Sequence, residues 1–130
     1  MPKIHRYAEI DEQERESRKE FIDKHSPFIH CARTAKKGEP FKITVRVGEH
    51  HAHLDEFDHY IANIQLYTAD TLLARADFVA GIVGGEQKRG NAEVTFSIVP
   101  MSSKLTLVAH SYCTKHGLWE SEPIEVSVSE

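Results

Sequence analysis

Alternation of hydrophobic and polar residues is the clearest signal in this chain. Residues 41–47 read FKITVRV, so every second side chain is apolar, which is the pattern of a strand with one face buried and the other exposed. The chain is therefore expected to be rich in β-structure. Similar alternation or apolar runs predict further strands at residues 61–68, 72–80, 92–98, 103–112 and 124–128.

Turn-forming residues separate the predicted strands. They concentrate at residues 37–40, 84–91 and 100–103, and the pair Gly84-Gly85 is interpreted as a hairpin turn. Six or seven short strands with such punctuation predict an all-β protein, an immunoglobulin-like antiparallel β-sandwich of about seven strands. The pattern shows no alternation of helices with strands and no glycine-rich phosphate loop, which disfavours a Rossmann or other doubly wound fold.

Residues 9–24 have a different character. The segment EIDEQERESRKEFIDK has a helix-forming composition but almost no apolar stripe, so any helix there is expected to be solvent-exposed and weakly packed. We therefore predict an extended or partly helical N-terminal arm at residues 1–24, followed by the β-sandwich with its site at residues 25–130.

Composition and charge exclude several classes of function. The chain has 130 residues, of which 40% are hydrophobic and 28% charged, as expected for one globular domain. Its formal net charge of −4, with basic residues scattered along the chain, argues against nucleic-acid binding. The charged N-terminus and the lack of a run of about 20 apolar residues predict no secretory signal and no membrane span. The expected location is therefore the cytoplasm.

Histidine and cysteine point to a metal site. The chain has nine histidines, and four of them fall within residues 50–59, a density that core packing does not explain because a buried imidazole needs a polar partner. Cys113 and His116 form a C-x-x-H step where a predicted strand ends, and a turn there would bring thiolate and imidazole together. Taken separately, the step is also compatible with coincidence, and the histidine segment with a solvated polar loop.

Three segments, taken in order, resemble the iron centre of the superoxide reductases, the family that includes neelaredoxin and the iron domain of desulfoferrodoxin. The resemblance runs from about residue 23 to the C-terminus, and its last segment is the most specific. The segments are Lys24-His25-Ser26-Pro27, then His53 and His59 followed by IANIQLY at 61–67, and finally SYCTKHGLWE at 111–120.

The resemblance implies an enzyme that reduces superoxide by one electron to hydrogen peroxide. It implies one mononuclear iron per chain, cycling between Fe2+ and Fe3+, with an open sixth position. Lys24 would be the catalytic residue that attracts superoxide and orders the water that protonates the product. A rubredoxin-like protein would supply the electron, and the chain would form a homodimer or homotetramer. The implied ligands are His25, His53, His59 and His116 in a square, with Cys113 on the axis.

The chain departs from the family pattern before the Lys-His pair, and also at Leu54 and Tyr60, which follow His53 and His59 where the family often has a proline and a second histidine. Members often carry a glutamate before the Lys-His pair that can occupy the sixth site of the ferric form, whereas this chain has Asp23, which is one methylene shorter. Asp23 is therefore a possible sixth ligand. In the histidine-rich loop, His50 and His51 compete with His53 for the ligand position, and the six-residue spacing to His59 selects His53.

Two other classes of protein compete with this interpretation. An electron-transfer cupredoxin is also a small sandwich with Cys and His ligands, but it usually has an axial methionine after the last histidine. Both methionines, Met1 and Met101, precede Cys113. A zinc-stabilised binding module without superoxide reactivity would need only three or four of the five candidate ligands. Loss of superoxide reactivity on substitution of Lys24 would separate an enzyme from such a module.

Overall fold

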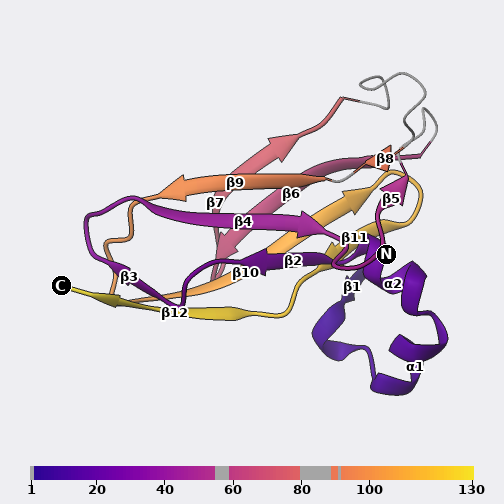
Figure 1. The fold of residues 1–130 in the computed structure, drawn as a ribbon, viewed down its shortest axis with the longest axis horizontal. Helices are drawn as coiled ribbons and strands as arrows, with labels where there is room; N and C mark the ends of the chain where they lie inside the picture. The colour runs from indigo at the N-terminus through magenta and orange to yellow at the C-terminus, as the bar shows by residue number, and fades with distance from the viewer. Residues whose placement is uncertain (1, 55–58, 80–88, 91) are drawn as a thin grey trace.

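The computed structural model describes residues 2–54, 59–79, 89–90 and 92–130, and in this part the chain forms two packed β-sheets with helices at one end (Figure 1). The all-β sandwich predicted from the sequence is confirmed. The larger sheet contains β1 (Ile4–Arg6), β3 (Thr34–Lys36), β6 (Ile61–Thr68), β7 (Thr71–Asp77), β10 (Lys104–Cys113), β11 (Gly117–Glu120) and β12 (Ile124–Ser129). The smaller sheet contains β2 (Pro27–His30), β4 (Phe41–Val47) and β9 (Glu93–Ile98), and a short pair joins β5 (His53–Leu54) to β8 (Arg89–Gly90).

Period-two patterning places the core between the two sheets. In β4, Ile43, Val45 and Val47 are at most 1% exposed, whereas Lys42, which precedes them, faces solvent. They belong to the same cluster as Ile64, Leu66, Leu107 and Ala109 of β6 and β10. Burying each large aliphatic side chain contributes about 1.5–3 kcal/mol, so this core holds the strand ends that carry the candidate site.

Strand β10 is the central strand of the larger sheet. It pairs antiparallel with β6 along one edge, and along the other edge with β12 in its first half and β11 in its second half. The ladder with β6 is irregular between Tyr112 and Cys113. Cys113 then pairs with Gly117, whose φ of +87° closes the turn back into β11. The C-x-x-H step therefore occupies a tight strand–turn–strand unit, as its sequence predicts.

Two strand pairings are parallel, in contrast to the antiparallel arrangement that was predicted. They join β1 to β11 and β3 to β12. Both short strands lie on edges of the larger sheet, where a segment that arrives from elsewhere in the chain can satisfy exposed backbone groups in either direction. Alternation within one strand specifies its faces but not the direction of its neighbour.

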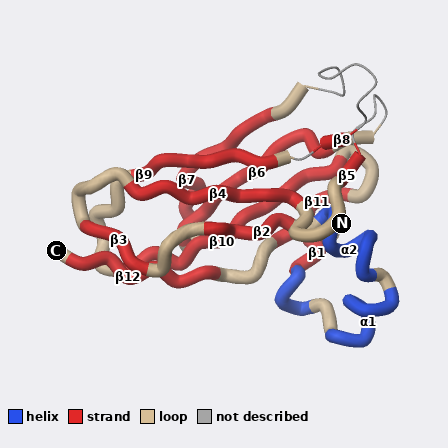
Figure 2. The backbone as a smooth tube through the Cα atoms, viewed as in Figure 1, coloured by secondary structure: helices blue, strands red, loops and turns tan. Residues whose placement is uncertain are grey.

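The N-terminal arm packs more tightly than its sequence predicts. It contains β1, a 3-10 helix (Tyr7–Glu9), α1 (Glu12–Ser17) and α2 (Lys19–His25), which lie together at one end of the sandwich (Figure 2). In α1 no residue is buried, as expected, but in α2 Ile22 is 2%, Asp23 9% and His25 0% exposed. A hydrophobic stripe does not reveal this face because two of its three buried side chains are polar. Helix α2 also crosses the predicted boundary between residues 24 and 25.

Some predictions concern residues outside the described part. The predicted hairpin turn at Gly84-Gly85 lies there, as does the end of the strand predicted at 72–80, of which β7 forms residues 71–77. Among the residues described, no helix has the length and apolar character needed to cross a membrane.

Candidate metal centre

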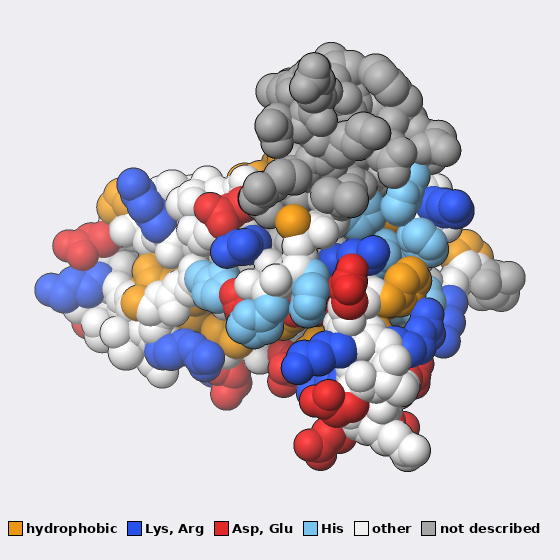
Figure 3. All heavy atoms as spheres, turned by 45° about the vertical axis from the view of Figure 1, so that its right-hand side comes forward, with side chains coloured by type: hydrophobic (Ala, Val, Ile, Leu, Met, Phe, Trp, Pro, Cys, Tyr) orange, Lys and Arg blue, Asp and Glu red, His pale blue; other side chains and the backbone are white. Residues whose placement is uncertain are grey.

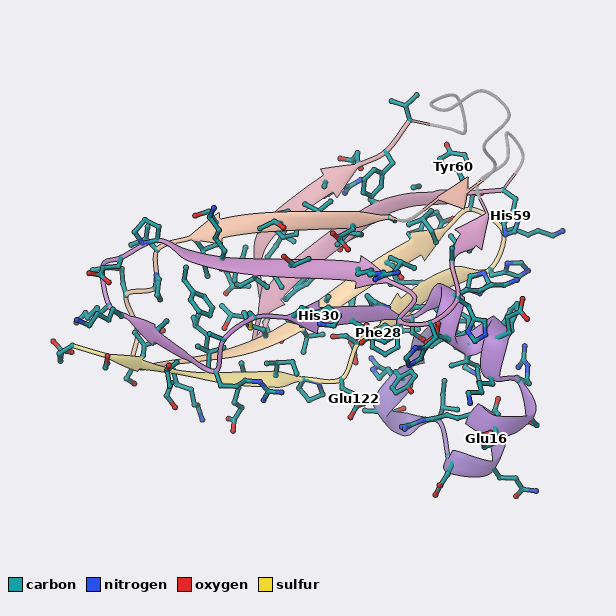
Figure 4. The ribbon with its side chains drawn as sticks, in the orientation of Figure 1. Glu16, Phe28, His30, His59, Tyr60 and Glu122 are labelled. Carbon is teal, nitrogen blue, oxygen red and sulfur yellow. The ribbon has the colours of Figure 1, made fainter. Side chains whose placement is uncertain are left out.

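Five predicted side chains meet at the end of the sandwich next to the helices. His25 is the last residue of α2, His53 opens β5, and His59 precedes β6. Cys113 ends β10, and His116 lies in the turn that follows. Figure 4 shows His59 and Tyr60 at this end, and Figure 3 shows histidine, lysine and arginine side chains gathered on the same face.

The four imidazoles are arranged approximately as a square. The ring centroids of neighbours lie 4.8 Å apart for His25 and His53, 4.7 Å for His53 and His59, 5.0 Å for His59 and His116, and 4.7 Å for His116 and His25. Each ring is steeply tilted to its neighbours, by 70° to 81°. The diagonal from His25 to His59 measures 6.5 Å, about 1.4 times a side, as a square requires. Ring nitrogens can therefore point at a common centre.

The sulfur of Cys113 lies close to two opposite corners of this square. Its Sγ is 3.5 Å from Nε2 of His53 and 3.7 Å from Nδ1 of His116. Near-equal distances to opposite corners place the sulfur midway between His53 and His116. In addition, the donor atoms of His25, His59, Cys113 and His116 all lie within 4.8 Å of one another, a group that does not include His53.

Hydrogen bonds hold three of the four segments of the site together. Ser111 Oγ donates a 2.8 Å hydrogen bond to the carbonyl of His25, which ties β10 to the end of α2. Tyr60 and Thr114 exchange two bonds: the Thr114 backbone N–H donates to the Tyr60 carbonyl at 3.0 Å, and the Tyr60 N–H donates to Thr114 Oγ1 at 3.2 Å. The segment that carries His59 is thereby fixed to the turn that carries His116.

A hydrogen bond fixes the tautomer of His25. Its Nδ1 lies 2.8 Å from the carbonyl oxygen of Phe21. A carbonyl only accepts, so Nδ1 carries the proton and Nε2 presents its lone pair to the centre, where it lies 3.1 Å from Nδ1 of His116. Burial lowers the pKa of His25 to about 3, which keeps the ring neutral at physiological pH. A neutral ring is the form that binds metals.

The environment of Cys113 favours the thiolate. Burial alone would raise the pKa of this fully buried thiol, but the contact with His53 and the backbone N–H groups of Lys115 and His116 outweigh it, and the pKa is lowered. The His116 N–H donates to Sγ at 3.4 Å. The thiolate is the form of cysteine that ligates metals.

Aromatic side chains pack against the candidate ligands His25 and His116, and the sequence did not predict this role. Trp119 donates from Nε1 to the His116 carbonyl at 3.2 Å and stacks on His25 with centroids 5.3 Å apart. His5 stacks on Trp119 at 4.3 Å, and Phe21 contacts His25, His116 and Trp119 edge-on or tilted. The only signal for Phe21 was a single aromatic residue in a polar helix, which is too little to assign it.

The remaining predicted residues surround this group. Lys24 is partly exposed, and its charge adds to burial in lowering the pKa of both His25 and His116. The Asp23 carboxylate contacts the backbone of residues 49–51, and the cluster of donor atoms does not include it. His50 is exposed, and His51 contacts Asp23.

The donor set fits iron. Imidazole nitrogens suit divalent iron, and one thiolate adds a softer donor. If His53 joined the group of four, the five donors would exceed the four that structural zinc takes in a tetrahedral site. His25 shows the second feature expected of a ligand, a hydrogen bond from its other ring nitrogen to a backbone carbonyl.

Comparisons with known proteins agree with this geometry. The desulfoferrodoxin family model matches residues 16–122. The chain is 30% identical over 110 residues to a superoxide reductase of Pyrococcus furiosus, which covers 77% of this chain and 86% of that protein. It is 31% identical over 110 residues to a neelaredoxin of Megalodesulfovibrio gigas, covering 76% and 84%. A solved superoxide reductase (neelaredoxin) of Ignicoccus hospitalis superimposes with a TM-score of 0.71 at 27% identity, covering 97% of this chain and 95% of that one.

Proposed function

Because this chain belongs to the desulfoferrodoxin family, we propose that it is a superoxide reductase whose iron is held by four histidines and Cys113. The observation that carries the proposal is the square of His25, His53, His59 and His116 with a thiol sulfur near its axis. When bound, the iron supplies the single electron that reduces superoxide to hydrogen peroxide. The protein's part is to hold this site, attract the anion and deliver protons.

Charge and exposure favour the approach of an anion. Four neutral imidazoles and one thiolate leave a divalent iron site with a net charge of about +1. His25, His53 and Cys113 are buried, whereas His59 and His116 are partly exposed. Among the described residues, His59 and His116 therefore form the more accessible edge of the site. The sulfur of Cys113 is buried against His53 and His116, so water does not screen its negative charge.

Lys24 is the residue that we assign to substrate attraction and to ordering the water that protonates the product. Its charge already acts on His25 and His116. We expect Lys24→Ala to lower the second-order rate with superoxide by about tenfold while iron stays bound, because the steering charge is lost. The dependence of the rate on salt should also become shallower. Stopped-flow or pulsed generation of superoxide at several ionic strengths measures both effects.

Two further variants provide controls for Lys24. Lys24→Arg keeps the charge and should retain most of the rate. Lys19→Ala removes an exposed lysine from the first turn of the same helix and should leave the rate unchanged. Equal rates in Lys24→Ala and the unsubstituted protein would remove Lys24 from the mechanism.

The electron donor and assembly belong to this proposal as well. We propose that a rubredoxin-like protein re-reduces the site and that the chain works as a homodimer or homotetramer. We also propose the cytoplasm as its location, since Cys31 and Cys113 are both free thiols and a reducing compartment keeps them so.

The function is tested with protein loaded anaerobically with iron. The oxidised form should show a visible thiolate-to-iron charge-transfer band that disappears on reduction. Superoxide added to the reduced form should restore the band in equal amounts, without evolving oxygen. A colourless protein that retains only zinc, or an iron form inert to superoxide, would instead indicate a metal-stabilised electron-transfer or binding module.

A further inference from the structure

The Asp23 carboxylate accepts hydrogen bonds from the backbone of the histidine-rich loop at residues 49–51. Its Oδ2 accepts hydrogen bonds from the backbone N–H groups of His50 at 2.9 Å and His51 at 2.8 Å, and its Oδ1 accepts one from Glu49 at 3.3 Å. Nδ1 of His51 lies 3.4 Å from the same Oδ2. Three consecutive backbone donors that converge on one buried carboxylate form an anion-binding nest. Here the anion is a side chain of α2.

A second contact ties the loop to α2 on the other side of His25. The Gly48 N–H donates to the Ser26 carbonyl at 2.9 Å, and Ser26 Oγ donates to the Ile22 carbonyl at 2.6 Å. Asp23 and Ser26 thus hold the loop at two points that flank His25 in sequence. The loop continues to His53 two residues after its last bond to Asp23.

The hydrogen bonds between the loop and α2 depend on a tight turn at Gly48. Gly48 has a φ of +85°, and a Cβ built there would lie 2.2 Å from the carbonyl oxygen of His51. The loop therefore folds back sharply on itself. That fold aims the N–H groups of residues 49–51 at α2.

We propose that Asp23 is a positioning residue, which holds the loop against α2 and so sets His53 against His25, and that its carboxylate does not ligate the iron. This inference rests on the ligand set of the proposed function. To reach the metal, the carboxylate would have to abandon three backbone donors. Hydrogen bonds to a charged acceptor each contribute to stability, so these three contacts keep Asp23 on the loop. An iron held by the proposed ligands would then remain accessible to exogenous anions in the oxidised form as well as in the reduced form.

The first test uses the full chain without metal. Amide hydrogen exchange, followed by NMR, should be at least about tenfold faster at residues 49–51 in Asp23→Ala than in the unsubstituted protein, because the loop loses its acceptor. Asp23→Asn keeps one acceptor oxygen and should give an intermediate exchange rate. It replaces Asp23→Ala in this test if the alanine variant does not fold. Glu20→Gln, an exposed acid on the same helix, is the matched control. Unchanged exchange in Asp23→Ala and Asp23→Asn would overturn the positioning role.

The second test separates a positioning residue from a ligand. Azide is titrated into the oxidised iron form while the charge-transfer band is recorded. If Asp23 is not a ligand, the azide affinity of the metal-loaded Asp23→Asn protein should match that of the unsubstituted protein, whereas iron affinity falls in both redox states. A carboxylate ligand would predict tighter azide binding and a shifted band in the variant, in the oxidised form alone, and this result would contradict the proposal.

The two proposals fail in distinguishable ways. The exchange measurement needs neither metal nor superoxide. Protection of residues 49–51 by Asp23 together with an iron form that is inert to superoxide would leave the positioning role intact and remove the reductase function.

Discussion

Replacing Cys113 by serine is expected to abolish the visible charge-transfer absorption of the oxidised protein and to slow superoxide reduction by at least about a hundredfold. The magnitude follows because changes to groups that merely support a ligand already cost about 10- to 100-fold. The sulfur is fully buried and lies within 3.7 Å of two imidazole nitrogens on opposite corners of the square. A serine hydroxyl does not ionise there, so both the thiolate's charge and its electron donation are lost.

This experiment needs a measurement of metal content and a control variant at the second cysteine. Iron measured per chain shows whether the four imidazoles still hold the metal when the axial donor is gone. Cys31→Ser changes a half-buried free thiol that packs against the core and should keep both the absorption and the rate. Absorption that survives in Cys113→Ser but disappears in Cys31→Ser would show that Cys31, and not Cys113, provides the thiolate ligand.

Gly48→Ala is expected to lower the free energy of unfolding by about 3 kcal/mol and to impair iron binding. The new Cβ would lie 2.2 Å from the His51 carbonyl oxygen, at a φ of +85°. Strained backbone alone costs about 1–3 kcal/mol, and the steric conflict adds to it unless the turn opens. Opening the turn would pull residues 49–51 away from Asp23 and displace the segment that leads to His53.

Gly38→Ala is the matched control because it isolates the backbone term. Gly38 has nearly the same φ, +82°, but apart from its chain neighbours no heavy atom of the described residues lies within 4 Å of the position of its Cβ. This variant should lose only about 1–2 kcal/mol and should bind iron normally. Urea unfolding of the metal-free variants gives both values. Equal losses in the two variants would mean that the Gly48 turn is not sterically constrained.

The strands and the grouping of the candidate ligands were predictable from the sequence for different reasons. Alternation locates strands because successive side chains of a strand point to opposite faces of the sheet, so that every second residue is buried. Strands β4 and β9 follow this pattern closely. The ligands, in contrast, are far apart in the chain, and only the spacing of His53, His59 and the C-x-x-H step, read through a family resemblance, predicted their convergence. The square arrangement in the structure agrees with that prediction.

The contacts around the ligands were not predictable because they join segments with no shared pattern. Helix α2 buries Asp23 and His25, residues that any hydrophobicity pattern scores as exposed. Phe21 and Trp119 meet only after β11 has folded back beside β10. The bond from the His51 N–H to Asp23 spans 28 residues and depends on a turn at Gly48 that has no signal beyond the glycine itself.

The measurement that tests the central claim most directly is the yield of hydrogen peroxide per superoxide consumed, with excess reductant and the iron-loaded protein. A reductase that takes its electron from the iron site forms one hydrogen peroxide for each superoxide and releases no oxygen. We predict that result for the unsubstituted protein and its loss in Cys113→Ser. One hydrogen peroxide for every two superoxide, accompanied by oxygen, would show dismutation and would contradict the proposed function.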